Sequence, residues 1–529
     1  MLRLQSAVNK YRLALLLLIS AVLRLIIASQ IELGNDEVYY INYALYPDLS
    51  HFDHPPMIGW LIQLFTLNLA LSAEVWIRLG SVVAGTISTL LIYRIGMKLA
   101  DKETGWYSAL LYNVSIYGFV ITGIFTMPDS PQMLFWLLTV LLLLEAMDES
   151  AKHTSGLFLL AGIAGGLALL SKYTSIFLFI GTLLYFMKNR KWFGKWYVYA
   201  AVFIGFLLFT PVLYWNMKNG FVSFTFHTDR VELNEGLFRL DYFAKELGGQ
   251  MLYNNPFNFV MLIAALIALF RKKLIIKNDK AYLLVCISLP LILIFLGISL
   301  FRSTLPHWSG PAYVTMIPLA ALWLRQQTAP GRQGKLIPVQ LKWASGFFVM
   351  VLLIAVLQLF QGLFLNKGID AQTGKRLGIK DITLDMYGWK QLSNQFEKLY
   401  THDLQTKQMN SESVIVSHRW FPAANIDYYV ARPSGIKVLT LGALERTHKY
   451  AWITQQRGSY HPGMDAYFIS SSYDFADPCA MYTEFFTTIE GPDTIPVYRK
   501  DLLVEYFYVW RMKDLVKIPP ADLTGKDVQ

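Results

Sequence analysis

The stretch YRLALLLLISAVLRLIIASQI, residues 11–31, decides the fold class because it is a nearly continuous apolar run. About 20 helical residues cross the ~30 Å hydrocarbon core of a bilayer, so this run is long enough to span a membrane. The segment behind it, NDEVYYINYALYPDLSHFDHPPMIGW at residues 35–60, is acidic and aromatic and contains no lysine or arginine. We therefore expect the chain to leave the membrane here and to present an acidic loop on the far side.

The composition places the chain among polytopic membrane proteins. Of its 529 residues, 54% are hydrophobic and 16% are charged, whereas soluble proteins carry about 25% charged residues. The net charge of +10 could indicate a nucleic-acid partner, but cations that gather in cytoplasmic loops explain it better. The only cysteines, Cys286 and Cys479, predict neither a disulfide framework nor a cysteine metal site.

Apolar runs of this kind recur through the first two thirds of the chain and predict about eleven membrane spans. They lie at residues 11–31, 75–98, 105–125, 131–147, 155–171, 174–187, 196–214, 256–270, 281–300, 311–325 and 343–365. The shorter run 57–71 predicts a helix in the membrane interface. A basic start and no evident cleavage site predict that the first span is a retained signal anchor.

Cations in alternate loops set the orientation. Clusters of lysine and arginine occupy residues 94–102, 188–195 and 271–280, and the intervening loops hold only scattered cations. The positive-inside rule then places the N-terminus in the cytoplasm and the loop 35–60 outside. The expectation is a multi-pass protein of the cytoplasmic (inner) membrane, with its polar site facing the periplasm or exterior.

Residues 366–529 have a different character, with no spanning segment. The β-rich runs SVIVS, IKVLTL, DAYFIS and FYVWRM alternate with helical stretches at 387–400 and 422–431. This pattern predicts a small α/β domain. The expected organisation is a transmembrane domain at 1–365 and a soluble extracytoplasmic domain at 366–529.

Three outer carboxylates are candidates for proton chemistry. Asp36 and Glu37 follow the first span closely, and a carboxylate beside low-dielectric walls can act as a general base. A solvated acidic loop explains this pair equally well. Asp129, in FTMPDSPQM, stands at the start of a predicted helix, where capping alone accounts for an aspartate; the two roles can coexist.

The motif FDHPPM contains Asp53 and His54 in front of a Pro-Pro pair that stiffens the exit from the turn. A proline-ended surface loop is the plain alternative. Together with His227 of SFTFHTDR, Asp53 could bind a divalent metal ion, although two ligands are a weak signal.

Further polar residues at outer boundaries could recognise an anion. They are Lys172 and Tyr173 in LLSKYTS, Arg230 in SFTFHTDR, and Arg302 and His307 in FRSTLPHWSGP. A lone lysine between apolar runs usually extends to the interface. Cations from several loops can instead converge on a phosphate at the membrane surface.

The chain has no convincing loop for cradling a nucleotide. GIAGGLALLSK, residues 162–172, is similar to a P-loop only superficially and lies within an apolar span. An outward-facing transferase would therefore need an activated donor that reaches the outer face without a nucleotide. A sugar on a polyprenyl phosphate meets this requirement.

Five motifs in order, DEVYY, FDHPPMIGW, MPDSPQMLFW, LLSKYT and SFTFHTDR, resemble those of a known family. They look like the bacterial membrane glycosyltransferases related to protein O-mannosyltransferases and to the lipid A aminoarabinose transferase. DHPP is most similar to the branch that includes the lipopolysaccharide galacturonosyltransferases. The resemblance covers about residues 10–325 and implies a C-type membrane glycosyltransferase (GT-C) fold that uses a polyprenyl-phosphate sugar.

The resemblance also implies roles for the carboxylates and for one histidine. Asp36 would be the catalytic carboxylate, Glu37 would shape the acceptor site, and Asp129 would line the same cavity. His54 stands where the aminoarabinose transferase carries a lysine, so it would contact the donor phosphate only when protonated.

By the same resemblance, Asp53 and His227 fall at metal-binding positions, with aspartate in place of glutamate. Arg230 and Arg302 would contact the donor phosphate. Apart from this metal ion no cofactor is expected, and the partners are the lipid-linked donor, membrane lipids and an envelope acceptor.

The expected reaction is a single displacement that inverts the anomeric carbon, with Asp36 deprotonating the acceptor hydroxyl. The acceptor could be lipid A, another envelope glycan or a protein hydroxyl. A lipid-linked saccharide transporter is a rival, but transporters usually show repeats and polar residues near mid-membrane. A scaffold for residues 366–529 would leave the outer-loop motifs unexplained.

Overall fold

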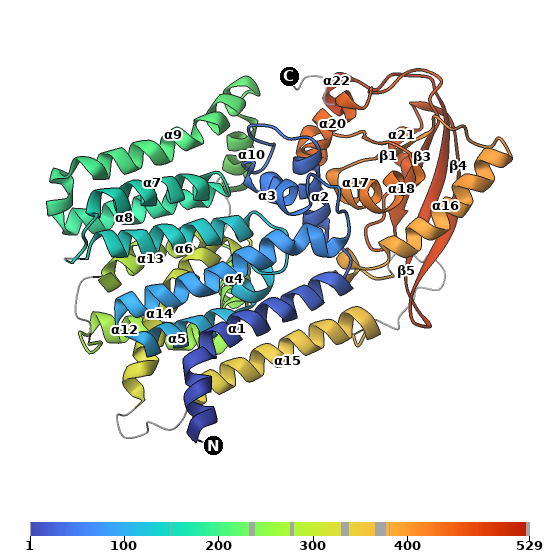
Figure 1. The fold of residues 1–529 in the computed structure, drawn as a ribbon. Helices are drawn as coiled ribbons and strands as arrows, with labels where there is room; N and C mark the ends of the chain where they lie inside the picture. The colour runs from blue at the N-terminus through green and yellow to red at the C-terminus, as the bar shows by residue number, and fades with distance from the viewer. Residues whose placement is uncertain are drawn as a thin grey trace. The chain divides into compact units, whose positions relative to one another are not determined.

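The computed structural model describes residues 2–148, 150–231, 238–275, 280–328, 338–364, 377–379 and 381–524. The chain divides into two compact units (Figure 1). Unit 1 comprises Met1–Gln30 and Pro47–Val351, and unit 2 comprises Ile31–Tyr46 and Leu352–Gln529. The predicted boundary at 365/366 lies outside the described residues, so that division stays a prediction.

Unit 1 is built from helices, as the hydropathy pattern predicts. They are α1 (Leu2–Gln30), α3 (Met57–Phe65), α4 (Glu74–Leu99), α5 (Lys102–Asn113), η1 (Tyr117–Ile121), α6 (Asp129–Ala146), α7 (Thr154–Leu169), η2 (Tyr173–Ser175), α8 (Ile176–Lys188), η3 (Arg190–Gly194), α9 (Trp196–Lys218), α10 (Val222–Val231), α11 (Leu240–Tyr253), α12 (Pro256–Phe270), α13 (Lys280–Ser299), η4 (Pro306–Ser309) and α14 (Gly310–Gln327), with α15 (Val339–Gln361) passing from unit 1 into unit 2.

Every predicted span overlaps at least one helix, but the helices differ in length. Among the described residues, six helices are long and apolar enough to cross a membrane, or seven if the bent pair α11–α12 is one span. The helices α7 and α8 have only 16 and 13 residues. The predicted segment 105–125 is interrupted, because α5 ends at Asn113 and the π-helical turn η1 follows. The chain is a multi-pass membrane protein.

Small residues allow these helices to approach one another closely. A Cβ added to Gly162 of α7 would lie 2.3 Å from the carbonyl oxygen of Ala201 in α9. A Cβ added to Gly181 of α8 would lie 2.3 Å from the Cα of Ile287 in α13. Membrane helices pack largely through such contacts, since lipid removes the hydrophobic drive between them. In Figure 1, α6, α7 and α9 run side by side.

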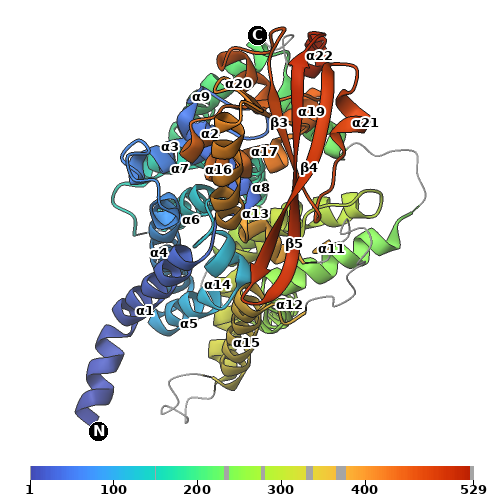
Figure 2. The same ribbon diagram turned by 90° about the vertical axis from the view of Figure 1, so that its right-hand side faces the viewer.

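Unit 2 contains the predicted α/β sheet. Its strands are β1 (Val414–Ser417), β2 (Val438–Thr440), β3 (Ala466–Ser471), β4 (Phe486–Arg499) and β5 (Leu502–Leu515), in the order β2-β1-β3-β5-β4. β1 pairs in parallel with β2 and β3, and β5 pairs antiparallel with β3 and β4. The registers pair Ile415 with Val438 and Phe468 with Trp510. Figure 2 shows the long β4–β5 hairpin.

Helices join this sheet from both ends of the unit's sequence. They are α2 (Asn35–Leu45), η5 (Ile382–Met386), α16 (Trp389–Gln405), α17 (Trp420–Ile426), η6 (Asp427–Ala431), α18 (Arg432–Ser434), α19 (Leu444–Thr447), α20 (Tyr450–Gln456), α21 (Pro478–Tyr482) and α22 (Ala521–Thr524). One apolar core includes Phe468, Tyr482 and Trp510. The four predicted strands are therefore present, and β4 is an additional one.

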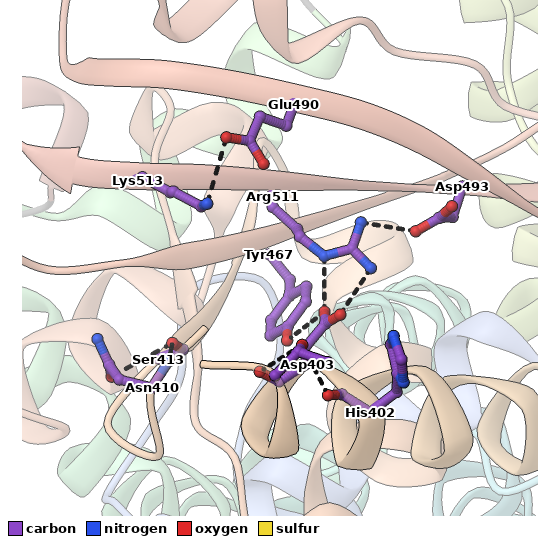
Figure 3. A network of polar contacts seen from close by, with 10 residues as sticks. His402, Asp403, Asn410, Ser413, Tyr467, Glu490, Asp493, Arg511 and Lys513 are labelled. Atoms are coloured by element: carbon purple, nitrogen blue, oxygen red, sulfur yellow. Dashed lines mark hydrogen bonds and ion pairs between the residues drawn. The ribbon is translucent and has the colours of Figure 1, made fainter. Parts of the chain in front are cut away.

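A buried ionic network ties α16 to the sheet (Figure 3). Asp403 accepts hydrogen bonds from Arg511 Nε at 2.6 Å and Nη2 at 2.8 Å, and from the Tyr467 hydroxyl at 2.9 Å. Arg511 also donates to Asp493 of β4 at 2.6 Å. A buried charge pair of this kind is tolerable because every polar group has partners. The network fixes helix, central strand and edge hairpin to one another.

Candidate functional site

Unit 1 contains a cavity of about 450 Å³ at which five of the predicted site residues meet. They are His54, Lys172, Tyr173, His227 and Arg230. The remaining lining is mostly apolar: Leu169, Thr174, Ile176, Phe177, Phe206, Phe209, Phe224, Thr228, Phe295 and Trp308. The cavity thus combines a few polar groups with extensive hydrocarbon and aromatic walls.

A buried ion pair lies beside this cavity. Lys172 Nζ lies 2.7 Å from Asp129 Oδ2, and the two side chains are only 7% and 1% exposed. The Tyr117 hydroxyl donates to Asp129 Oδ1 at 2.9 Å. Asp129 is the first residue of α6 and makes no capping hydrogen bond. The capping explanation is therefore wrong here: the carboxylate is committed to Lys172 and Tyr117.

The lysine is held by the break between two helices. α7 ends at Leu169, and Lys172 precedes the short helix η2 in extended conformation. Apolar packing of Leu169, Leu170 and Phe209 against Met57 surrounds this break. The lysine consequently points into protein, instead of extending to the interface as an isolated lysine would.

The FDHPPM turn contacts α10 through its backbone. His227 Nε2 lies 2.6 Å from the carbonyl oxygen of Asp53. A carbonyl only accepts, so Nε2 carries the proton. The rings of His54 and His227 are 5.9 Å apart, and Tyr173 lies 5.2 Å from His227. The motifs FDHPP, SKYT and FHTDR therefore meet at one place.

Burial keeps these histidines neutral. It lowers the pKa of His54 to about 3, against the opposing effect of Asp53. Burial also lowers the pKa of His227, and that of His307 to about 4 with a further contribution from Lys172. His54 therefore cannot replace a lysine as a cation near neutral pH, although it can still form neutral hydrogen bonds.

The predicted metal pair does not by itself form a metal site. Within the part of the chain that the structure describes, no group of three or more His, Cys, Asp or Glu residues is arranged to hold an ion. His227 uses Nε2 to bind the carbonyl of Asp53, which leaves only Nδ1 for a ligand. A divalent metal ion stays a prediction.

The other predicted anion contacts differ in their placement. Arg230 is exposed, lines the cavity and lies over the Phe226 ring at 4.6 Å. Arg302 donates to the carbonyl of Asp229 and is not part of the cavity wall. It thereby ties the segment after α13 to the helix that carries Arg230. His307 lies outside the wall but within electrostatic reach of Lys172.

Asp36 and Glu37 lie in unit 2, at the start of α2. The Glu37 carboxylate accepts the N–H of Gly34 at 2.9 Å and is buried, whereas Asp36 is exposed. Glu37 thus stabilises the helix start. Convergence of Asp36 with the cavity residues stays a prediction.

Partners from the far end of the sequence hold α2. Asn42 donates to the Tyr450 hydroxyl at 3.2 Å, and Tyr450 donates to Asp427 at 3.0 Å. Arg457 binds Asp427 at 2.8 Å and the Tyr46 hydroxyl at 3.0 Å. The helix that carries Asp36 is therefore a structural part of the C-terminal α/β unit.

Sequence reasoning missed several of these groups. The contact of Tyr117 with Asp129 could have been predicted from the sequence, because Tyr117 stands twelve residues before Asp129 at the same end of two consecutive predicted spans. The contacts of Asp427 and Tyr450 could not have been predicted, since no sequence pattern near them indicates a helix some 400 residues earlier. Phe224 and Trp308 resemble ordinary lipid-facing or core aromatics until the cavity is seen.

Part of the chain matches known proteins in sequence. Residues 53–215 match the family model described as dolichyl-phosphate-mannose-protein mannosyltransferase. Over 297 residues, 55% of the chain, the sequence is 26% identical to the lipid A galacturonosyltransferase RgtD of Rhizobium johnstonii, and the match spans 60% of that relative's length.

Solved structures agree over almost the whole chain. ArnT from Cupriavidus metallidurans in the apo state is 12% identical and superposes with a TM-score of 0.60 over 95% of this chain and 98% of its own. ArnT bound to undecaprenyl phosphate, also 12% identical, gives 0.61 over 94% and 97%. The fold is that of the C-type membrane glycosyltransferases. The family resemblance and fold class expected from the five motifs are thereby confirmed.

The buried pair generates a stability prediction. Asp129→Asn or Lys172→Met alone should lower the free energy of unfolding by about 3–5 kcal/mol, because each leaves the other charge buried without its partner. The double variant should lose less than the sum of the two. Thermal unfolding in detergent measures this, with Lys517→Met of the exposed Lys517–Glu484 pair as a control costing under about 1 kcal/mol. Additive losses would contradict the proposed coupling.

The neutral histidines generate a pH prediction. Their folded pKa values of about 3 and about 4 for His54 and His307 lie below the unfolded value of about 6.5. The unfolded state therefore binds more protons below pH 6.5, and unfolding free energy should fall by about 1.4 kcal/mol per pH unit per histidine as the pH drops. Thermal melts between pH 7.5 and 5 should show a shallower slope for His54→Gln. Exposed His153→Gln should keep the wild-type slope; equal slopes in all three proteins would refute the assignment.

Proposed function

We propose that this protein transfers a sugar from a polyprenyl-phosphate carrier to a hydroxyl of an envelope lipid or glycan, with lipid A as the favoured acceptor. The reaction would take place on the periplasmic face of the inner membrane. The observation that carries the proposal is the amphipathic cavity, in which Lys172 and Arg230 accompany an otherwise largely apolar wall. A phosphate attached to a long hydrocarbon chain has the matching chemistry.

The two cations of the cavity would bind a phosphate in different ways. Lys172 donates one N–H to Asp129, and an ammonium group has two further donors. Asp129 offsets the lysine charge, and Arg230 is the second cation of the wall. An arginine can bind phosphate through two N–H groups at once. Both would stabilise the phosphate as it leaves the sugar.

Asp36 is the proposed general base. It would remove the proton of the acceptor hydroxyl as that oxygen attacks the anomeric carbon. The carbon–oxygen bond to the carrier phosphate breaks in the same step, so the configuration inverts and the phosphate departs with its electron pair. The exposure of Asp36 on a helix held by buried contacts supports this role, because a base must be accessible yet fixed in position.

The proposed identity of the acceptor rests only on similarity to other proteins. RgtD is named for transfer to lipid A, whereas the matching family model is named for protein mannosylation. A protein hydroxyl is therefore the second candidate. Mass spectrometry of envelope lipids and glycoproteins, with and without the protein, distinguishes them by which fraction loses one sugar.

The base assignment predicts that Asp36→Asn lowers transfer at least about 100-fold while donor binding is retained. Purified protein in detergent with a radiolabelled polyprenyl-phosphate sugar measures both, and Glu412→Gln, an exposed acid of the same unit, should keep full activity. Full transfer by Asp36→Asn would remove the base assignment. Binding of donor without transfer by the wild-type protein to any tested acceptor would favour a carrier of lipid-linked sugars.

The cavity predicts a donor-specific defect for Arg230→Gln. Loss of the exposed guanidinium should raise the KM for the lipid-linked donor about tenfold or more, because a charge-assisted phosphate contact is lost. The KM for the acceptor should stay unchanged. Lys218→Gln removes an exposed cation elsewhere in unit 1 and serves as the control. An unchanged donor KM would place the phosphate elsewhere.

A further inference from the structure

A second cluster of cations lies in unit 2, at the carboxyl ends of its parallel strands. β1 is the central strand of the parallel part, with β2 on one side and β3 on the other. His418 and Arg419 directly follow β1, Arg446 follows β2, and Asp474 follows β3. Ligands of open α/β sheets bind at such carboxyl ends, where successive connections turn to opposite sides of the central strand.

The cations of this cluster are close enough to act on each other. Burial lowers the pKa of His418 to about 4, and the charges of Arg419 and Arg446 add to the effect. The charge of Arg446 also lowers the pKa of Arg419, after burial. One carboxylate, Asp474, pairs with Arg419. Two guanidinium groups and one carboxylate leave the cluster with a net positive charge.

One exposed guanidinium group of the cluster is available to a ligand. Among the described residues, no hydrogen bond or ion pair engages the exposed guanidinium of Arg446. Arg419 Nε and His418 Nδ1 are buried and likewise have no hydrogen-bond partner within the described chain. A buried donor without a partner, such as Arg419 Nε, is costly and uncommon in native proteins. An anion would offset the repulsion between the arginines.

An aromatic residue directly follows Arg419 in the sequence. This residue, Trp420, is partly exposed and stacks on His448 with centroids 5.6 Å apart and an interplanar angle of 19°. The ring of Tyr39 from α2 lies 5.0 Å away. A fixed indole supplies an apolar surface at low entropic cost. Indole and guanidinium together suit a sugar ring that carries a phosphate.

We propose that His418, Arg419, Trp420 and Arg446 form a binding site for a phosphorylated sugar, with the phosphate on the two arginines and the sugar ring against Trp420. The inference rests on the proposed function only where it identifies that sugar as part of the acceptor. The same chemistry occurs in a soluble sugar phosphate and in a phosphorylated glycolipid headgroup.

Saturation-transfer NMR on the full-length protein in detergent tests the site with glucosamine 1-phosphate as the probe. Ring protons of the probe should receive saturation, whereas N-acetylglucosamine, which is neutral, should bind at least tenfold more weakly, and inorganic phosphate should displace the probe only at concentrations at least tenfold higher than the probe's own dissociation constant. Arg446→Gln should raise the dissociation constant at least tenfold, and Arg446→Lys should retain part of the affinity. The exposed Lys398→Gln on α16 is the matched charge control and should change nothing.

Two further variants separate this site from the proposed active site. Arg230→Gln should bind the probe as the wild type does, because that residue belongs to the cavity of unit 1. Asp36→Asn should also bind normally, whatever happens to transfer. Loss of binding in Arg230→Gln, unchanged binding in Arg446→Gln, or equal binding of neutral N-acetylglucosamine would overturn the proposal.

Competition distinguishes the two sources of the ligand. If the site binds an acceptor headgroup, a synthetic phosphorylated glucosamine glycolipid in nanodiscs should displace the probe. It should do so at a lower concentration than soluble glucosamine 1-phosphate does. Displacement by the soluble sugar phosphate alone would retain the site and reject its role in acceptor binding. Displacement by an acidic peptide but by neither sugar would reject the site as a sugar-phosphate site.

Discussion

The buried contact between Lys172 and Asp129 is the interaction on which the chemistry of unit 1 depends. It places two opposite charges where both are nearly inaccessible, and neither is tolerable there without the other. Because Tyr117 binds the same carboxylate, three separated segments are fixed at one point. The ammonium group is thereby oriented toward a cavity while its charge is mostly offset.

The charges around the cavity determine which kind of anion it can bind. The histidines contribute neutral imidazoles, Asp129 offsets Lys172, and Arg230 is the second cation of the wall. A wall with two cations and many aromatic residues favours a ligand that is mostly hydrocarbon with one anionic group. A nucleotide, with several charges and a polar base, would find few partners here.

The sequence predicted what local pattern determines. Hydropathy located all six described helices that are long and apolar enough to span a membrane, and strand-like runs located four strands of the sheet. β4 escaped because FTTIEGPDTIPVYR contains a Gly-Pro pair and two acids, which are typical of a turn; it is an edge strand, where proline is tolerated. Lys172 and Asp129 were each identified as candidates, but their pairing depends on helix packing 43 residues apart in sequence.

The sequence did not predict that α2 belongs to unit 2. The tyrosines of NDEVYYINYALY suggest a loop at the membrane surface, yet Tyr39 packs against Trp420, and Asn42 and Tyr46 bind the Tyr450–Asp427–Arg457 network. Such contacts are invisible to local reasoning because the partners lie about 400 residues downstream.

The two-part origin of unit 2 has a consequence for biogenesis. Residues 31–46 leave the ribosome early, but the chain that completes their fold, residues 352–529, is made last. At about 5–20 residues per second, the N-terminal piece waits roughly twenty seconds or longer for its partner. A chain that stalls or is cleaved before the final strands would thus carry α2 without the segments that hold it, and would be a natural target for membrane quality-control proteases.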